Sequence, residues 1–352
     1  MKRFISIFLC LLLVVSVIAG CGQGNAAKEQ SQDTGQKSES SAAESKSVTV
    51  YTSHPAEIVN SIIKEFQEKT GIKVDLVEAG TGELLKRIQA ESGNPLGDVM
   101  WGGGAESLDA YKLYFESYKT SVDDKIPASY KDPNNTWTGF TTLPMVIMYN
   151  KKLVKESEVP DSWGSLLDPK WKGKIAYADP SASGSSYTIL VTILTAYGKD
   201  DGKGWDFIRK FVKNLDGKIL SGSSGVYKGV ADGEYSLGLT LEESAVRYLK
   251  SGADVGIVYP KEGTSAVPDG VALIKGAKHP ETAKTFIEFV LGKDVQQTMA
   301  NDFYRRSVRT DIDSPGEIKP LKDIPMVVYD FTWASKYKQE VLTQWKNIVT
   351  GK

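Results

Sequence analysis

Histidine and cysteine are scarce in this chain of 352 residues, which contains two of each. Cys10 and Cys21 both lie close to the amino terminus, so the rest of the chain has no thiol for a disulfide, a nucleophile or a cysteine-ligated metal site. His54 and His279 are too few for a multi-histidine zinc site, and a Ser-His-Asp triad is hard to assemble from them. We therefore expect a protein that is not an enzyme and that needs no cofactor and no resident metal.

Neither sign of charge is in excess. Lys and Arg number 43 and Asp and Glu number 44, which gives a formal net charge of -1. Without a basic excess, nothing in the composition favours a nucleic-acid partner. The hydrophobic share of 41% is ordinary for a soluble protein and supplies enough apolar material for one or two sizeable cores.

Long apolar runs are missing except at the start of the chain. Lys2 and Arg3 precede the run Phe4–Ile18, which is too short for a membrane span and is typical of a signal peptide. The run ends in Val17–Cys21, which resembles the lipobox of bacterial lipoproteins. We expect residues 1–20 to be a lipoprotein signal peptide and Cys21 to carry the lipid, palmitate included. A plain secretory signal with an incidental cysteine is the alternative.

The segment 21–46 is rich in Ser, Gln, Lys, Glu and Ala and has no large apolar residue, so it predicts a disordered tether behind the lipidated cysteine. The predicted location is the outer face of the cytoplasmic membrane, facing the periplasm in a diderm host. The lipid anchor is then the only membrane attachment.

From Ser47 onward, strand and helix patterns alternate in two successive series, which predicts an α/β fold with parallel-rich sheets and flanking helices. The long strand Gly139–Tyr149 separates the two series, and Gly270–Ile274 is the predicted second crossover. We therefore expect two lobes joined by a two-strand hinge: 47–140 with 272–325 as lobe 1, and 141–271 with 326–352 as lobe 2. The other predicted strands are Ser47–Thr52, Ile72–Val77, Asp98–Trp101, Ile175–Ala178, Lys218–Leu220, Ser236–Leu239 and Val255–Val258. Trp333–Val349 is predicted as one carboxyl-terminal helix.

Small and hydroxyl-bearing residues follow several of the predicted strands, and in such sheets ligands bind at the carboxyl ends of the strands. Short side chains let the backbone approach a ligand, and the amides that open the next helix favour an anion. Any one of these turns also reads as an ordinary loop, but their joint occurrence favours a binding edge. The candidate residues are Thr52, Ser53, His54, Thr81, Gly82, Trp101, Gly103, Ser183, Gly184, Ser185, Ser223 and Ser224.

The chain resembles the type-1 extracellular solute-binding lipoproteins of bacterial ABC importers over essentially its whole length from Ser47. The segments that carry the resemblance are Val50–Ser53, Gly97–Gly103, Trp163–Ile175, Tyr259–Thr264 and Gly276–Ala283. The resemblance implies the type II periplasmic-binding-protein fold, a monomer, and an ABC permease and ATPase as partners. It also implies that the serine-rich loops at 181–186 and 221–225 contact an anion.

Within this family the chain is similar to two branches, the ferric-ion binders and the binders of phosphorylated or phosphonate compounds. The ferric branch implies two adjacent tyrosines with a histidine and a glutamate, hard oxygen donors that suit Fe(III). This chain has no Tyr-Tyr pair: Thr240–Ser244 stands where the pair is expected, and Gly102–Gly104 where the glutamate is expected, although His54 lies near the histidine position. We therefore expect a small oxyanion-bearing solute, with ferric iron as the alternative.

Three further residues complete the candidate site. Glu242 is placed to meet an amine of the solute or to act as a helix-start acid that favours the dipole. Arg306, in the basic cluster Tyr304–Arg309, suits a phosphate or forms salt bridges with nearby acids. Tyr259 belongs to the Tyr259–Thr264 segment. A hydrolase on the same lobes and a purely adhesive lipoprotein are the competing classes; the first needs a nucleophile with a base or a metal cluster, and the second predicts no saturable binding.

Overall fold

Three parallel strands and the helices between them begin the fold of the computed structural model, which describes residues 46–316 and 318–352. Cys21, the predicted signal peptide and nearly all of the tether lie outside the described residues. The predicted alternation is confirmed here, because Ile58, Ile62 and Phe66 form the buried face of α1 and Gly71 ends the helix in the left-handed conformation. The first elements are β1 (Ser47–Thr52), α1 (Ala56–Thr70), β2 (Lys73–Glu78), α2 (Thr81–Ala90), β3 (Val99–Gly104) and α3 (Ala105–Ala110).

The second series of elements follows the short β4 (Phe115–Glu116) and the long β5 (Thr138–Asn150). It consists of β6 (Ile175–Ala176), α4 (Gly184–Tyr197), α5 (Lys203–Leu215), α6 (Ser223–Ala231), β7 (Leu237–Leu241), α7 (Glu242–Lys250) and β8 (Val255–Val258). The chain then returns through β9 (Ala266–Ile274), α8 (Pro280–Leu291), α9 (Lys293–Phe303) and β10 (Arg306–Ser307), and ends with α10 (Phe331–Lys336) and α11 (Lys338–Thr350).

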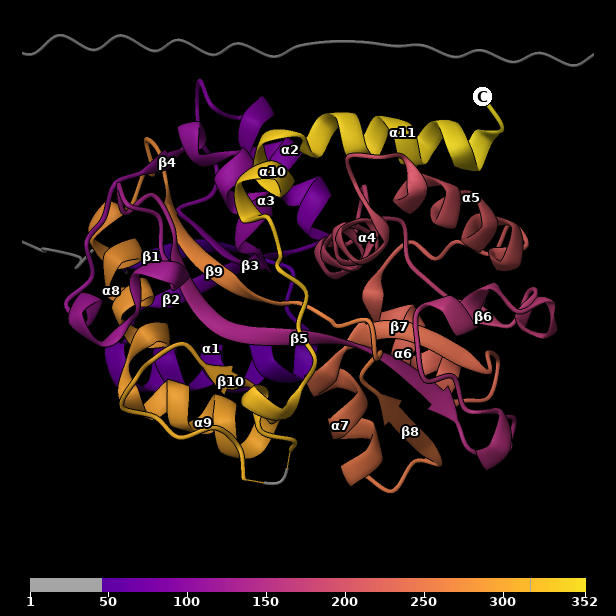
Figure 1. Cartoon of the computed structure of the whole chain (residues 1–352). Helices are drawn as coiled ribbons and strands as arrows, with labels where there is room; N and C mark the ends of the chain where they lie inside the picture. The colour runs from indigo at the N-terminus through magenta and orange to yellow at the C-terminus, as the bar shows by residue number, and fades with distance from the viewer. Residues whose placement is uncertain (1–45, 317) are drawn as a thin grey trace, which may run out of the picture. The chain divides into compact units, whose positions relative to one another are not determined.

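The strands form one mixed path in the order β2-β1-β3-β9-β5-β7-β6. Pairing is parallel for β1 with β2 and β3 and for β6 with β7, whereas β5 and β9 pair antiparallel with all their neighbours. β5 belongs to both halves, because its residues up to Pro144 pair with β9 and those from Met145 pair with β7 and β8. Figure 1 shows β5 running across the molecule from the half with α1 and α8 to the half with α6 and β8.

Each half has its own hydrophobic cores. In lobe 1, built on β1 to β3, one core forms around Phe66 and Phe286 and another around Leu84 and Leu108. In lobe 2, built on β6 to β8, the larger core gathers α4 and α5 around Trp163. The fold is therefore the predicted two-lobed periplasmic-binding-protein type, with β5 and β9 as the strands that connect the lobes. None of the helices in the described residues is long and apolar enough to cross a membrane.

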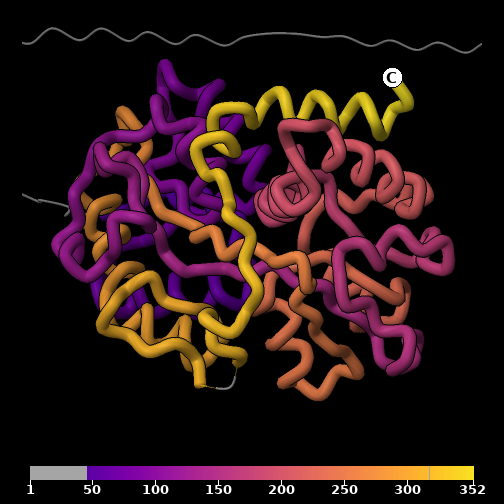
Figure 2. The backbone as a smooth tube through the Cα atoms, in the orientation of Figure 1, coloured from indigo at the N-terminus to yellow at the C-terminus, as the bar shows by residue number. Residues whose placement is uncertain are grey.

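Two predicted elements differ from the structure in more than their bounds. The predicted strand at Lys218–Leu220 is reduced to a single bridge between Leu220 and Ala178, because the amides of Lys218 and Ile219 donate within turns and α6 begins soon after. The predicted carboxyl-terminal helix is broken at Tyr337 into α10 and α11. α10 packs on α3 in lobe 1 and α11 on α5 in lobe 2, so a single straight helix cannot serve both contacts. Figure 2 shows the yellow carboxyl-terminal tube passing along the top of both halves.

Candidate functional site

A cavity of about 390 Å³ lies where the loops of the two lobes meet. Lobe 1 contributes the segment 52–57 after β1, the segment 78–81 after β2, and Gly103 and Gly104 at the end of β3. Lobe 2 contributes the first turns of α4 and α6, and Leu143, Met145 and Val267 on β5 and β9 add an apolar floor. The loops that follow the strands of lobe 1 and those of lobe 2 thus line the same cavity from opposite sides.

The wall formed by lobe 2 is rich in donors. Ser183 caps α4 by accepting a hydrogen bond from the Ser186 amide, and its hydroxyl lies 3.1 Å from that of Ser185. Gly222 precedes α6, where no side chain caps the first turn. Lys228 lies one turn further along α6 and also lines the cavity. Because the first amides of a helix carry partial positive charge, two helix starts and one lysine make this wall favourable for an anion.

The wall formed by lobe 1 combines hydroxyls with acids. Thr81 donates a hydrogen bond to the Ser53 hydroxyl at 3.0 Å, and both residues line the cavity. Glu57 and Glu78 are exposed at the cavity lining and offer carboxylates. A solute with its anionic group against lobe 2 would therefore meet acceptors for hydroxyl or ammonium donors on the other side.

A buried ionic cluster, of which Asp269 and Arg305 line the cavity, joins both lobes. Arg305 donates to Asp269 on β9 at 2.7 Å and to Glu243 on α7 at 3.3 Å, and also to the Thr141 hydroxyl on β5 at 3.1 Å. Burial raises the pKa of Asp269, with Arg305 opposing the rise. Burial also acts to raise the pKa of Glu243, but the Arg305 and Arg247 guanidinium groups outweigh it, so the pKa of Glu243 lies below its ordinary value.

Ten of the predicted site residues line this cavity. They are Thr52, Ser53, His54, Thr81, Gly103, Ser183, Gly184, Ser185, Ser223 and Ser224. The structure thus brings together the loops of both lobes that the strand-end argument selected.

Three of the predicted residues are bound to each other outside the cavity lining. Arg306 donates two hydrogen bonds to Glu242, at 2.8 and 2.9 Å, and the Tyr259 hydroxyl donates to the same carboxylate. Arg306 and Glu242 are 3% and 1% exposed, so their charges are already paired in a buried site. Of the two roles predicted for each residue, the structure therefore agrees with the one that does not involve the solute: Arg306 forms a salt bridge, and Glu242 is an acid at the start of a helix.

Trp101 and Gly82 also lie outside the cavity lining. Trp101 is fully buried and packs edge-on against the His54 ring, with 4.6 Å between the ring centroids. Gly82 is at the contact between the lobes, where its amide donates to the Ala182 carbonyl at 3.0 Å. Trp101 therefore supports a cavity residue, and Gly82 permits the close approach of α2 to the loop before α4.

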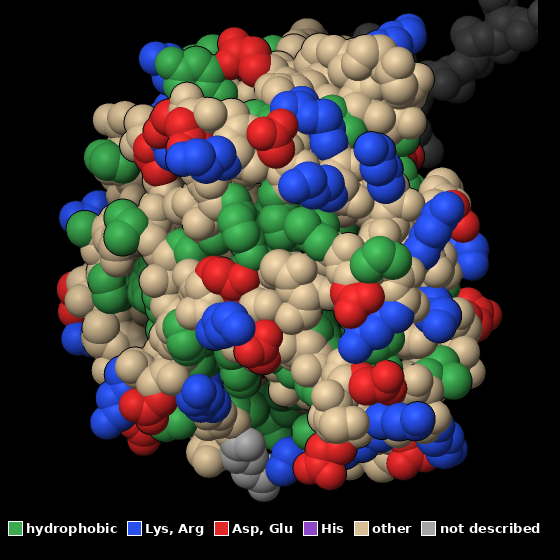
Figure 3. Space-filling model, turned by 45° about the vertical axis from the view of Figure 1, so that its right-hand side comes forward, with side chains coloured by type: hydrophobic (Ala, Val, Ile, Leu, Met, Phe, Trp, Pro, Cys, Tyr) green, Lys and Arg blue, Asp and Glu red, His purple; other side chains and the backbone are tan. Residues whose placement is uncertain are grey.

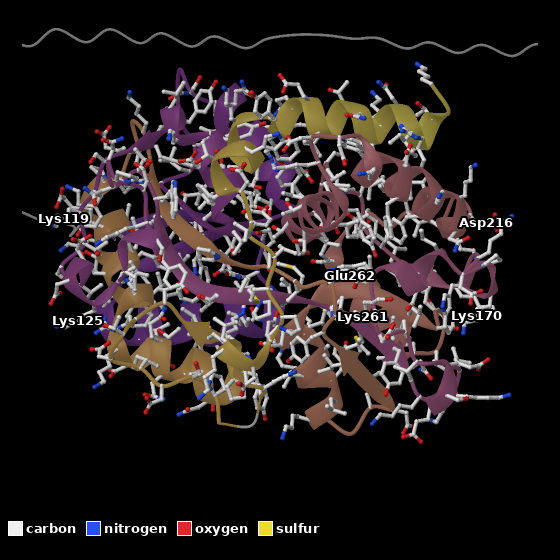
Figure 4. All side chains as sticks on the ribbon, viewed as in Figure 1. Lys119, Lys125, Lys170, Asp216, Lys261 and Glu262 are labelled. Carbon is white, nitrogen blue, oxygen red and sulfur yellow. The ribbon has the colours of Figure 1, made fainter. Side chains whose placement is uncertain are left out.

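The Tyr259–Thr264 and Trp163–Ile175 segments, which carried much of the resemblance, bind each other. Glu262 accepts hydrogen bonds from the Trp163 and Gly164 amides, both at 3.1 Å, and the Trp163 indole donates to the Gly263 carbonyl at 3.0 Å. Figure 4 labels Glu262 and its neighbour Lys261 on the half that contains β7 and β8. These segments stabilise lobe 2 and do not line the cavity.

Five charged residues of the cavity lining are not among the predicted site residues, although Arg305 belongs to the predicted basic cluster Tyr304–Arg309: Glu57, Glu78, Lys228, Asp269 and Arg305. Two of them had a usable signal. Lys228 stands four residues after Ser224 and so shares its helix face, and Asp269 is an isolated acid in a strand whose other buried residues are mainly apolar. For the neighbours Arg305 and Arg306 the sequence gives no reason to choose one over the other, because the choice depends on how the chain leaves α9.

Side chains that commonly hold metals are dispersed. Among the residues that the structure describes, no group of three or more histidine, cysteine, aspartate or glutamate side chains is placed to bind a metal ion. Tyr227 lines the cavity, and burial raises the pKa of its hydroxyl to about 12.

The surface in Figure 3 carries acidic and basic side chains side by side, with no field of one sign on that face.

Known proteins resemble the chain over most of its length. It is 28% identical over 326 residues to "Iron uptake protein A1" of Synechocystis sp., covering 87% of this chain and 86% of that protein. It is also 28% identical over 267 residues to a "Putative 2-aminoethylphosphonate-binding periplasmic protein" of Salmonella typhimurium, covering 72% of this chain and 74% of that protein.

Among solved structures, the periplasmic binding protein AfuA of Actinobacillus pleuropneumoniae, with exogenous fructose-6-phosphate bound, superposes with a TM-score of 0.81 at 26% identity, covering 87% of this chain and 99% of AfuA. The model of the family described as "Bacterial extracellular solute-binding protein" matches residues 108–326, which include β5, β9 and all of the elements from β6 to β8. The chain belongs to this family of bacterial extracellular solute-binding proteins.

Proposed function

We propose that this protein is the receptor of an ABC importer that captures a small oxyanion-bearing solute, a phosphorylated or phosphonate compound, by closure of its two lobes. As a member of a solute-binding family it is a binding protein and not an enzyme. The observation that carries the choice of solute is the wall of the cavity formed by lobe 2, where the starts of α4 and α6 and the residue Lys228 line one space.

The chemistry of this wall suits a phosphoryl or phosphonyl group. Such a group has three acceptor oxygens and at least one negative charge, and hydroxyl and amide donors at helix starts satisfy both. The volume of about 390 Å³ is in the range of pockets for small molecules. Glu57 and Glu78 on the opposite side add acceptors for the hydroxyl or amino groups of the rest of the solute.

Ferric iron is the alternative solute, and the similarity to "Iron uptake protein A1" favours it. Fe(III) needs several anionic oxygen donors. In the cavity lining Asp269 is already bound to Arg305, and Glu57 lies 3.9 Å from Arg247, so two of the acids have cationic neighbours. These contacts support the oxyanion over the metal.

The proposed mode of action is a clamp. Lobe 1 (47–140 with 272–325) and lobe 2 (141–271 with 326–352, apart from α10, which packs on α3 of lobe 1) rotate about β5 and β9. The solute stabilises the closed arrangement by contacts with both lobes. The closed form then docks as a monomer on a membrane permease with its ATPase. The lipid on Cys21 keeps the receptor at the outer face of the membrane.

A thermal-shift screen tests the proposal. The panel is fructose 6-phosphate, phosphoglycerate, 2-aminoethylphosphonate, inorganic phosphate and ferric citrate. A specific solute at 100 times its Kd adds about 2.7 kcal/mol to the free energy of unfolding. We expect an organic phosphate or phosphonate to stabilise the protein, and Lys228→Gln to weaken this binding at least about tenfold, while Lys210→Gln, on the exposed face of α5, leaves it unchanged. Stabilisation by ferric citrate alone would overturn the proposal.

A further inference from the structure

The imidazole of His54 is held in one orientation at the back of the cavity. Its side chain is 3% exposed. Trp101 and Phe140 pack against the ring, with centroids 4.6 and 5.4 Å away. The two ring nitrogens therefore face fixed surroundings, and these surroundings determine which nitrogen carries a proton.

One ring nitrogen faces a group that can only donate. Nδ1 of His54 lies 3.4 Å from Nη1 of Arg305. A guanidinium group has no acceptor, so Nδ1 must supply its lone pair to this contact. Burial, and next the positive charge of Arg305, hold the pKa of His54 well below its ordinary value, so the ring is neutral. A neutral ring with an accepting Nδ1 has its single proton on Nε2.

The other ring nitrogen lacks a partner. Nε2 is buried without a hydrogen bond to any described residue. The Oδ2 atom of Asp269 lies 3.6 Å away, which is too long for a hydrogen bond, and it already accepts from Arg305 at 2.7 Å. A buried N–H without an acceptor costs free energy. His54 lines the cavity, but its Nε2 atom is covered in this arrangement of the lobes, so a solute oxygen reaches Nε2 as the lobes rotate and is then the acceptor that removes this cost.

We infer that Arg305 fixes His54 as the Nε2–H tautomer, so that His54 donates a hydrogen bond to an oxygen of the solute and does not offer a lone pair to a metal ion. The inference rests on the proposed function and names Arg305 and His54 as residues that determine which solute the cavity binds. Arg305 is a positioning residue, because it acts through His54. A metal ion could bind Nε2 only after the proton had moved to Nδ1, where it would face the N–H of the guanidinium.

The tautomer can be measured without any ligand, because only two imidazoles are present. A long-range proton–nitrogen NMR spectrum at pH 8 distinguishes a protonated from an unprotonated ring nitrogen, and His279→Gln assigns the signals. His279 is an internal control: its Nδ1 lies 2.9 Å from a carboxylate oxygen of Asp98 and must donate. We expect opposite tautomers, Nε2–H for His54 and Nδ1–H for His279. An Nδ1–H tautomer or an imidazolium at His54 would overturn the inference.

Two substitutions test the donor role with the phosphate or phosphonate that the screen identifies. His54→Gln keeps an N–H donor and His54→Phe keeps the ring shape without one. Titration calorimetry should show binding by His54→Phe weaker than by His54→Gln by about 10- to 100-fold, the loss of one hydrogen bond to a charged acceptor. Equal affinities would overturn the donor role. If only ferric citrate binds, the proposed function fails, and the NMR measurement still decides the tautomer.

Discussion

Gly82→Ala should prevent closure of the lobes without touching the solute. Gly82 lies in the first turn of α2, and its amide donates to the Ala182 carbonyl of lobe 2. A methyl group on Gly82 would stand 1.9 Å from the Ser181 carbonyl oxygen and 2.9 Å from its carbon. Both of these partners are backbone atoms, which cannot rotate away. The two lobes must therefore separate at this contact.

The size of the effect follows from these distances. Ordinary contact begins near 3.4 Å, so the loop must move by roughly 1.5 Å relative to α2. Overpacking of this kind costs about 1–3 kcal/mol, and loss of the hydrogen bond from the Gly82 amide adds about 1 kcal/mol. The closed form is thus destabilised by about 2–4 kcal/mol, which weakens solute binding by about 30- to 1,000-fold.

The stability of the separated lobes should change in the opposite direction. Alanine is a better helix residue than glycine by about 0.5–1 kcal/mol, and α2 is otherwise undisturbed. We expect urea denaturation without solute to show unchanged or slightly higher stability, while calorimetry shows weaker binding. The matched control is Gly93→Ala, where a methyl group meets nothing within 4 Å. If Gly82→Ala binds as tightly as the parent protein, the solute-bound form does not make this contact.

Three further outcomes are expected from single substitutions. Glu262→Ala leaves the Trp163 and Gly164 amides and the Tyr197 hydroxyl without their acceptor, and should lower the free energy of unfolding by about 1–3 kcal/mol. Lys261→Ala removes only an exposed ion pair with Asp161 and should change it by less than about 1 kcal/mol; equal losses would contradict this assignment. Ser183→Ala removes the cap of α4 and should cost about 1 kcal/mol of stability in urea, with a loss of solute affinity as well; unchanged affinity would remove Ser183 from the site. Burial lowers the pKa of Lys338 to about 7, and the charge of Glu106 opposes this shift. In Glu106→Gln, Lys338 is protonated in the unfolded chain and neutral in the native protein between about pH 7 and 10, so the free energy of unfolding should rise with pH in this range. Denaturant titrations should show a rise of at most about 1.4 kcal/mol per pH unit, and a flat profile would refute the reasoning.

Local patterns were sufficient for most of the fold. The apolar runs of β1 and β8 and the long strand that became β5 are visible in the sequence, because each pattern reflects burial of its own element. The break at Tyr337 and the loss of the strand at Lys218–Leu220 were not visible. Both depend on which neighbours the segment packs against, which a local pattern does not contain.

The candidate site was predictable to a similar degree. The loops at strand ends were found because the topology of an alternating sheet sends them to one edge. The charged residues of the site were harder to predict, because the sequence does not show which partner an acidic or basic side chain meets. Glu242 and Arg306 are predicted site residues that are bound to each other, whereas Lys228 and Asp269 are not predicted and line the cavity.

By itself, the sequence determined the two-lobed α/β fold, the family and the serine- and glycine-rich character of the binding edge, since these follow from periodicity, segment order and residue size. Only the tertiary structure decided which charges face the cavity, which charges neutralise each other, and that the Arg305 guanidinium lies against the Nδ1 atom of His54. The reason is physical: a charge acts through its nearest partners in space, and Arg305 meets residues that lie 36, 62 and 251 positions away in the chain.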